Sequence, residues 1–224
     1  IPFFSRSMWL NMLMMVAMIT CVAWIGNTNA VFQYRMKVEG HLMRGEYHQA
    51  RKVGQKSLES DADLMRLRMY ALARCNELGE HLFEYPITGN SSQILPTSGK
   101  TKMLLCPTDS IYKFMGARPA VPMEPERYLA MLQRRDSVNH IAIADYLLCG
   151  YLIDKQLDRF AQEISHYYPL NAQLPKHYRE ALTLYTHSRS NPSVVYQVPE
   201  VEENYANYQE LKKQYRDPME QKTR

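Results

Sequence analysis

The residues best suited to chemistry in this chain are those of "SGKT", Ser98 to Thr101, which have the types that end a phosphate-binding loop. In such a loop the lysine and the hydroxyl hold phosphate and Mg²⁺, while an earlier glycine lets backbone amides wrap the phosphates. That glycine must stand five places before the glycine of "SGKT", and this chain has Ile94 there. The stretch 89–92 that precedes it is polar, whereas an apolar strand is needed. The pattern therefore speaks against a nucleotide site.

Two histidines, His41 and His48, stand seven residues apart and would share one face of a continuous helix as metal ligands. Gly45 lies between them and favours a helix end, so we expect solvated or capping side chains instead. The cysteines occur singly, with no C-x-x-C pair and no histidine cluster at zinc spacing. We expect buried thiols at Cys21, Cys75, Cys106 and Cys149.

Other signatures of bond chemistry are missing from the sequence, which has no G-x-S-x-G, H-E-x-x-H or DFG-like motif. The triplet "NSS" at Asn90 is an acceptor for N-glycosylation, of interest only where the source glycosylates and exports this loop. The net charge of +4 is spread along the chain and gives no basic footprint for nucleic acid. We therefore predict a protein that is not an enzyme, with no catalytic residue, cofactor, metal or nucleic-acid partner.

An uncharged apolar run, "MWLNMLMMVAMITCVAWIG", covers residues 8–26. About twenty such residues suffice to cross the hydrocarbon core of a bilayer. Trp9 and Trp24 stand near its two ends, where indole rings favour the headgroup zone. The run predicts a transmembrane helix, with the lipid bilayer as its partner through residues 8–26. A signal peptide cleaved after Ala30 is the alternative.

Charges beside the apolar run bear on its orientation. Arg6 precedes the run, whereas Arg35, Lys37 and Arg44 follow it. On the positive-inside rule this distribution favours a cytoplasmic body. Because few residues precede the run, we leave the side of the membrane open.

Beyond residue 30, apolar residues recur at the three- and four-residue spacing of helices. Gly45 separates two such stripes and suits the positive φ of a helix end. We expect Tyr47 to wedge into a helix crossing and Ala50 to be small enough for two backbones to approach. The corner predicts a hairpin formed by the stripe Val31, Tyr34, Val38 and Leu42 and the stripe Tyr47, Ala50, Val53 and Leu58.

Further stripes follow the same spacing. One is expected to begin at an N-cap, Asp61 or Asp63, and to end at Gly79. In "LPKHYREALTLY" the pair Tyr178 and Ala181 repeats the tyrosine–alanine spacing of the first corner. The stripes are Leu64, Leu67, Ala71, Cys75 and Leu78; Ile141, Ala144, Leu148 and Leu152; and Leu157, Phe160, Ala161, Ile164 and Tyr168. Such hairpins favour an all-α fold, in which an N-terminal transmembrane helix precedes a tetratricopeptide-like α-solenoid.

Composition divides the chain into five parts. Residues 86–125 are rich in Pro, Gly, Ser and Thr and are expected to form a connector without a long helix, before a helix that begins near Glu126. A stripe in the tail predicts a helix that caps the stack, or one whose tyrosines dock a partner. Its members are Val201, Tyr205, Tyr208, Leu211 and Tyr215. The parts are 1–30 (transmembrane helix and flanks), 31–85 (first hairpins), 86–125 (connector), 126–190 (second hairpins) and 191–224 (capping helix and tail).

Two segments carry a resemblance to a known family. "YALARCNELGEHLFEYPITGNSSQIL", Tyr70 to Leu95, and "DYLLCGYLIDKQLDRFAQEI" with "LPKHYREALTLY" resemble uncharacterised Bacteroidetes membrane proteins that have several spans followed by a tetratricopeptide-like C-terminal region. The chain departs from that family at Thr88, where a Gln is usual, and in a shortened middle. The resemblance implies a bacterial source, the inner membrane and a cut inside a longer multi-span chain at Ile1, but no activity.

These observations favour a membrane-anchored helical-repeat scaffold or protein-interaction module that binds a protein or peptide, with its oligomeric state left open. The alternative is the C-terminal accessory region of a larger multi-span membrane enzyme or transporter. A soluble nucleotide-binding enzyme based on "SGKT" is the third and weakest hypothesis.

Overall fold

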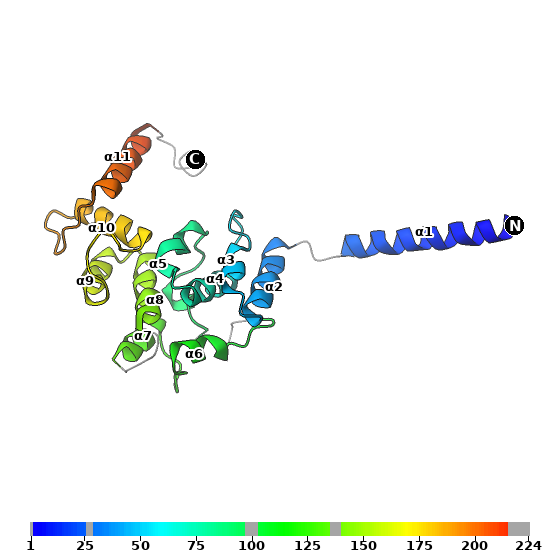
Figure 1. The fold of residues 1–224 in the computed structure, drawn as a ribbon, viewed down its shortest axis with the longest axis horizontal. Coiled ribbons are helices and arrows are strands. Elements are labelled where there is room, and N and C mark those ends of the chain that lie inside the picture. Colours follow the sequence, from blue (N-terminus) through cyan, green and yellow to red (C-terminus); the bar gives the residue numbers. More distant parts are fainter. Residues whose placement is uncertain (1, 26–28, 97–102, 135–139, 215–224) are drawn as a thin grey trace.

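The computed structural model describes residues 2–25, 29–96, 103–134 and 140–214, and within these ranges it contains helices and no strand. The expected all-α class is thus confirmed. Figure 1 shows α1 projecting from a body that holds the other helices. The helices are α1 (Pro2–Ile25), α2 (Ala30–Met43), α3 (Tyr47–Lys52), α4 (Ala62–Arg74), α5 (Leu78–His81), α6 (Asp109–Met115), α7 (Pro125–Gln133), α8 (His140–Ile153), α9 (Leu157–Tyr167), α10 (Lys176–Ser188) and α11 (Pro199–Gln214), with 3₁₀ turns η1 (Leu82–Glu84) and η2 (Ser91–Gln93).

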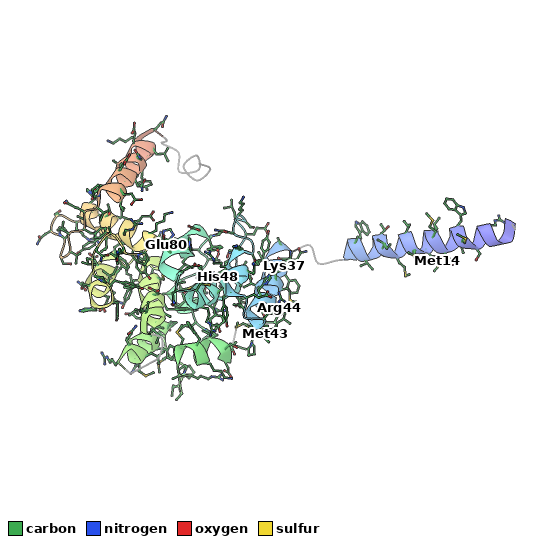
Figure 2. The ribbon with its side chains drawn as sticks, viewed as in Figure 1. Met14, Lys37, Met43, Arg44, His48 and Glu80 are labelled. Atoms are coloured by element: carbon green, nitrogen blue, oxygen red, sulfur yellow. The ribbon has the colours of Figure 1, made fainter. Side chains whose placement is uncertain are left out.

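The rest of the protein does not cover the apolar surface of α1. Its stretch Arg6–Trp24 is long and apolar enough to cross a membrane, and none of this stretch is buried against the rest of the protein. Figure 2 shows Met14 on α1, far from the body. A signal sequence near an N-terminus passes the same test of length and apolar character, so the structure does not decide between the transmembrane helix and the signal peptide.

The first corner has the expected geometry. Gly45 follows α2 with a φ of +74°, and Ala50 on α3 is 0% exposed. Helices α2, α3 and α4 all contact one another. The expected length of the second stripe is wrong, however. Helix α3 ends at Lys52, Gly54 takes a φ of +65°, and Leu58 is 90% exposed, because the chain has left the helix before reaching it.

The next stripe, from Leu64 to Leu78, begins as expected and ends differently. The Asp61 carboxylate accepts a hydrogen bond of 2.6 Å from the Leu64 N–H, so Asp61 is the N-cap of α4. The helix ends near Asn76, which takes a φ of +57°. Gly79, expected at that end, lies inside α5, where a Cβ would come within 2.6 Å of the Tyr178 ring. Gly79 is therefore a close-approach residue between α5 and α10.

The connector, residues 86–125, contributes to the core. It contains η2 and α6, which are short as its composition predicts. Glu39 of α2 is fully buried and accepts hydrogen bonds from the N–H groups of Leu104, Leu105 and Cys106. The following helix, α7, begins at Pro125, one residue from the expected start. The connector is thus attached to the first hairpin by a buried carboxylate.

Helix α8 lies at the centre of the body. It contacts α4, α5, α7 and α9, and so joins the hairpins on both sides of the connector (Figure 1). Helix α10 packs on α5, α9 and α11. Only the first turns of α11 are packed: Val201 is buried, whereas Tyr208 is 52% exposed. The capping role expected for the tail is thus limited to the start of α11, and Tyr215 lies outside the described residues.

The packing at Ala50 can be tested by substitution. Ala50→Leu adds methylenes where α3 meets α2 and α4, and we expect it to lower the free energy of unfolding by about 1 to 3 kcal/mol. The exposed Lys56 provides the control, since Lys56→Ala should change stability by less than about 0.5 kcal/mol. Urea denaturation of a chain starting at Val31 reports both values. Equal effects of the two substitutions would contradict the buried corner.

Candidate functional site

Most of the residues singled out for chemistry are not brought together. "SGKT", residues 98–101, lies outside the described residues. Asn90 is exposed directly before η2. His41 lies on α2 and is paired with Glu46 at 2.6 Å, whereas His48 lies on α3, so Gly45 separates the two histidines as expected.

The cysteines divide into two kinds. Cys106 and Cys149 are buried, as expected. For the other two the expectation is wrong: Cys21 is exposed on α1, and Cys75 is half-buried at the end of α4, where the helix leaves the core. Cys75 lies close to His48 and Glu77.

The group with the most strongly perturbed acidity surrounds Asp145 of α8. Its carboxylate accepts hydrogen bonds from the hydroxyls of Tyr168, at 2.7 Å, and Tyr178, at 2.9 Å. The Cys149 thiol lies 3.5 Å from the same Tyr178 hydroxyl. Burial raises the pKa of Asp145 to about 6, although the two tyrosine hydroxyls act in the opposite direction.

Perturbed acidity often marks an active site, but the Asp145 group has no access for a substrate. Asp145 is 3% exposed, and Tyr178 and Cys149 are fully buried. Burial also raises the pKa of Cys149, which keeps the thiol protonated and unreactive. The arrangement is therefore a structural network that holds α8, the end of α9 and α10 together.

An open apolar surface lies along α10. On one side of this helix an apolar hollow of ≈ 430 Å³ faces the corner between α8 and α9. It is lined by Phe83, Leu152, Lys155, Leu157, His177, Glu180, Ala181 and Leu184. On the other side a hollow of ≈ 340 Å³ lies between α10 and α11, lined by Glu180, Thr183, Leu184, Val201, Asn204, Tyr205 and Tyr208.

The two hollows share Glu180 and Leu184, and together they are called the α10 groove. Leu184 is 41% exposed between them. Tyr205 is held in place by stacking on His187, with ring centroids 4.4 Å apart. The groove thus has a central leucine, an aromatic wall and a floor formed by the core.

Few charges lie at the α10 groove. Glu180 accepts a hydrogen bond of 2.9 Å from His177, and this bond lowers the pKa of Glu180, so the carboxylate is ionised at neutral pH. Lys155 also lines the larger hollow. An apolar surface with one anionic centre can bind an apolar helix face that carries a cation.

Sequence reasoning did not find this groove, although a signal was present. On α10 the buried face holds Tyr178, Leu182 and Tyr185, while Ala181 at its edge and the exposed Leu184 form an adjacent apolar strip. A helix that is apolar on more than one face needs a second partner. The tail tyrosines, proposed as an alternative docking face, contribute Tyr205 and Tyr208 to the groove.

Comparison with known proteins gives one match. The profile of a family of unknown function (DUF6057) matches residues 122–224, which include α7 to α11 and therefore much of the α10 groove. The match includes the second of the two segments that carry the resemblance. No curated protein and no solved structure matches the chain.

The buried Asp145 makes stability depend on pH. Its pKa is raised from 3.8 in the unfolded chain to about 6, so its favourable contribution is complete below about pH 4 and is lost as pH rises through 6. Over this window wild-type protein should lose up to about 3 kcal/mol relative to Asp145→Asn, which cannot ionise. Urea unfolding at several pH values measures the difference.

Asp158→Asn is the matched control, because Asp158 is exposed and its pKa is lowered by Arg189. That substitution should leave the destabilisation between pH 4 and 7 in place. An equal dependence on pH in wild type and Asp145→Asn would show that Asp145 is not buried as described.

Proposed function

We propose that this protein is a membrane-anchored helical-repeat scaffold without intrinsic catalysis, and that the α10 groove binds an amphipathic helix of a protein partner. The observation that carries the proposal is the exposure of Leu184 between two apolar hollows. Two apolar hollows on either side of an exposed leucine suit the apolar side chains of a docked helix.

The repeat architecture is supported by the order of contacts. Short helices pack on their neighbours in sequence, as α2, α3 and α4 do, and again as α7, α8 and α9 do. Tyrosine and alanine three residues apart recur at Tyr47 and Ala50 and at Tyr178 and Ala181, and both alanines are buried. These features agree with a tetratricopeptide-like stack, in which concave surfaces hold partner segments.

The apolar lining and the charge of the α10 groove indicate what kind of helix would bind there. Helical partners bind grooves through apolar side chains at positions i, i+3, i+4 and i+7. Leu184 and the tyrosine wall suit such a stripe, and the ionised Glu180 suits a Lys or Arg beside it. The proposed partner segment is therefore a basic amphipathic helix.

The proposed location is a bacterial inner membrane, with α1 as the anchor. The length and apolar character of Arg6–Trp24 support the anchor, and the resemblance to Bacteroidetes membrane proteins supports the bacterial setting. Arg35 and Lys37 on α2 and Arg44 at its C-cap follow the anchor and favour a cytoplasmic body on the positive-inside rule.

Membrane anchoring can be tested by extraction. The full chain should remain in the membrane pellet after washes with high salt and with alkaline carbonate, because residues 8–26 bury a span's length of apolar surface in lipid. A chain starting at Val31 should appear in the soluble fraction. Release of the full chain by salt alone, or a cellular product that begins at Val31, would rule the anchor out.

The groove can be tested with displayed peptides. Helical peptides selected for binding to a chain starting at Val31 should carry an apolar stripe and a flanking basic residue. Leu184→Asp should weaken their affinity by about tenfold or more, because a charge would replace the apolar centre of the groove. Fluorescence anisotropy with a labelled peptide measures the change.

Leu58→Asp is the control, since Leu58 is a fully accessible leucine outside the groove. It should leave the peptide affinity unchanged. Peptides that bind wild type and Leu184→Asp equally would contradict the groove. If light scattering shows that Leu184→Asp converts a dimer to a monomer, the groove is occupied by a second copy of this chain and the partner-helix proposal fails.

A further inference from the structure

Three side chains with metal-binding chemistry gather where α3 meets the turn between α4 and α5. His48 comes from α3 (Figure 2), Cys75 caps the end of α4, and Glu77 directly precedes α5. One ligand atom of each, an imidazole nitrogen, the thiol sulfur and a carboxylate oxygen, lies within 4.8 Å of the other two. These residues are called the His48 cluster below.

Two of the side chains of the His48 cluster, those of His48 and Cys75, have no hydrogen-bond partner that would compete with an ion. Within the residues that the structure describes, neither the His48 imidazole nor the Cys75 thiol forms a hydrogen bond. His48 is exposed, while Cys75 and Glu77 are half-buried. The cluster therefore rests on protein on one side and is open to solvent on the other, which gives an ion a path of entry.

An ion pair holds the two sides of the cluster together. Arg51 Nη1 lies 3.0 Å from Glu77 Oε2. Arg51 and His48 are three residues apart on α3, so they share one face of that helix. The Arg51 backbone carbonyl also accepts a hydrogen bond from the buried Tyr85 hydroxyl. Arg51 thus docks α3 on the turn and orients the Glu77 carboxylate, as groups that hold a metal ligand in position do in known metal sites.

We propose that His48, Cys75 and Glu77 bind a Zn²⁺ ion. Nitrogen, sulfur and oxygen donors are the three kinds that zinc accepts. One thiolate and one carboxylate balance the charge of the ion, and the imidazole binds as the neutral base. Binding replaces the Cys75 S–H bond by a zinc–sulfur bond, and the displaced proton passes to the solvent.

The geometry suits a four-coordinate ion. Ligand bonds of about 2.0 to 2.3 Å place tetrahedral donors about 3.5 Å apart, so donor atoms that lie within 4.8 Å of one another must approach by at most about 1.3 Å. Rotation of the unbonded His48 and Cys75 side chains supplies this movement. Three protein ligands leave the fourth position to water. The ion would join α3 to the end of α4, and so stabilise the first corner of the fold independently of the α10 groove.

The test is titration of the reduced full chain in detergent micelles with Co²⁺, a spectroscopic substitute for Zn²⁺. Thiolate ligation should give a near-ultraviolet charge-transfer band and intense visible bands of four-coordinate cobalt, saturating at one ion per chain. Added Zn²⁺ should remove both sets of bands by displacement. It should also raise the melting temperature, since the ion binds the folded state.

Cys75→Ser should abolish the charge-transfer band, and His48→Gln and Glu77→Gln should each weaken Zn²⁺ binding by more than about tenfold. The controls are Cys21→Ala and His41→Ala, which remove the same side-chain types outside the cluster and should leave binding unchanged. Circular dichroism establishes that each variant is folded. If Cys75→Ser does not fold, His48→Gln provides the test in its place, because His48 is exposed. Failure of wild type to give the bands, their persistence in folded Cys75→Ser, or an unchanged Zn²⁺ affinity of His48→Gln would overturn the proposal.

Discussion

The buried carboxylate of Asp145 is the interaction on which the body depends. A carboxyl group removed from water is costly unless hydrogen bonds replace its hydration, and here the hydroxyls of Tyr168 and Tyr178 supply them. The acceptor lies on α8 and the donors lie at the end of α9 and on α10. The Tyr178 ring also packs against Gly79 of α5, where a side chain would collide with it. One tyrosine therefore joins both halves of the chain, and any alternative packing of α10 would leave Asp145 with the Tyr168 hydroxyl but without that of Tyr178.

Buried polar groups elsewhere stabilise the segments that lack long helices. Glu39 accepts three backbone N–H groups of residues 104–106, which have no helical partner for them. Arg68 donates to the Gly54 carbonyl at 3.2 Å, and its guanidinium lies over the Tyr85 ring. In both cases a helix supplies the charged side chain and a loop supplies the backbone. The helices bury apolar faces, while the irregular segments are ordered by charge-assisted hydrogen bonds.

Periodicity predicted the helices well and their contacts poorly. The N-cap at Asp61 and the turn at Gly45 depend on neighbours in sequence, so local spacing was enough. The position of Gly79 depends on Tyr178, about a hundred residues away. The spacing of residues within one helix does not predict a contact between segments so far apart in the sequence. For the same reason the α10 groove, whose walls come from α8, α9 and α11, and the His48 cluster could not be derived from the spacing of their members. Leu58 was wrongly assigned to a buried helix face, because the apolar stripe was continued past Gly54, where the chain turns away.

The contact between α5 and α10 also bears on the order in which the chain can fold during synthesis. The Lys176 N–H donates to the Glu80 carboxylate across a separation of 96 residues. Helices α2 to α5 therefore leave the ribosome well before the segment that covers α5 has been made. Until then the surface around Gly79 stays uncovered, and the loop that must close is long, which slows folding. The nascent chain thus passes through a stage in which its first hairpins are formed but exposed, and a chaperone that shields apolar helices would act at that stage.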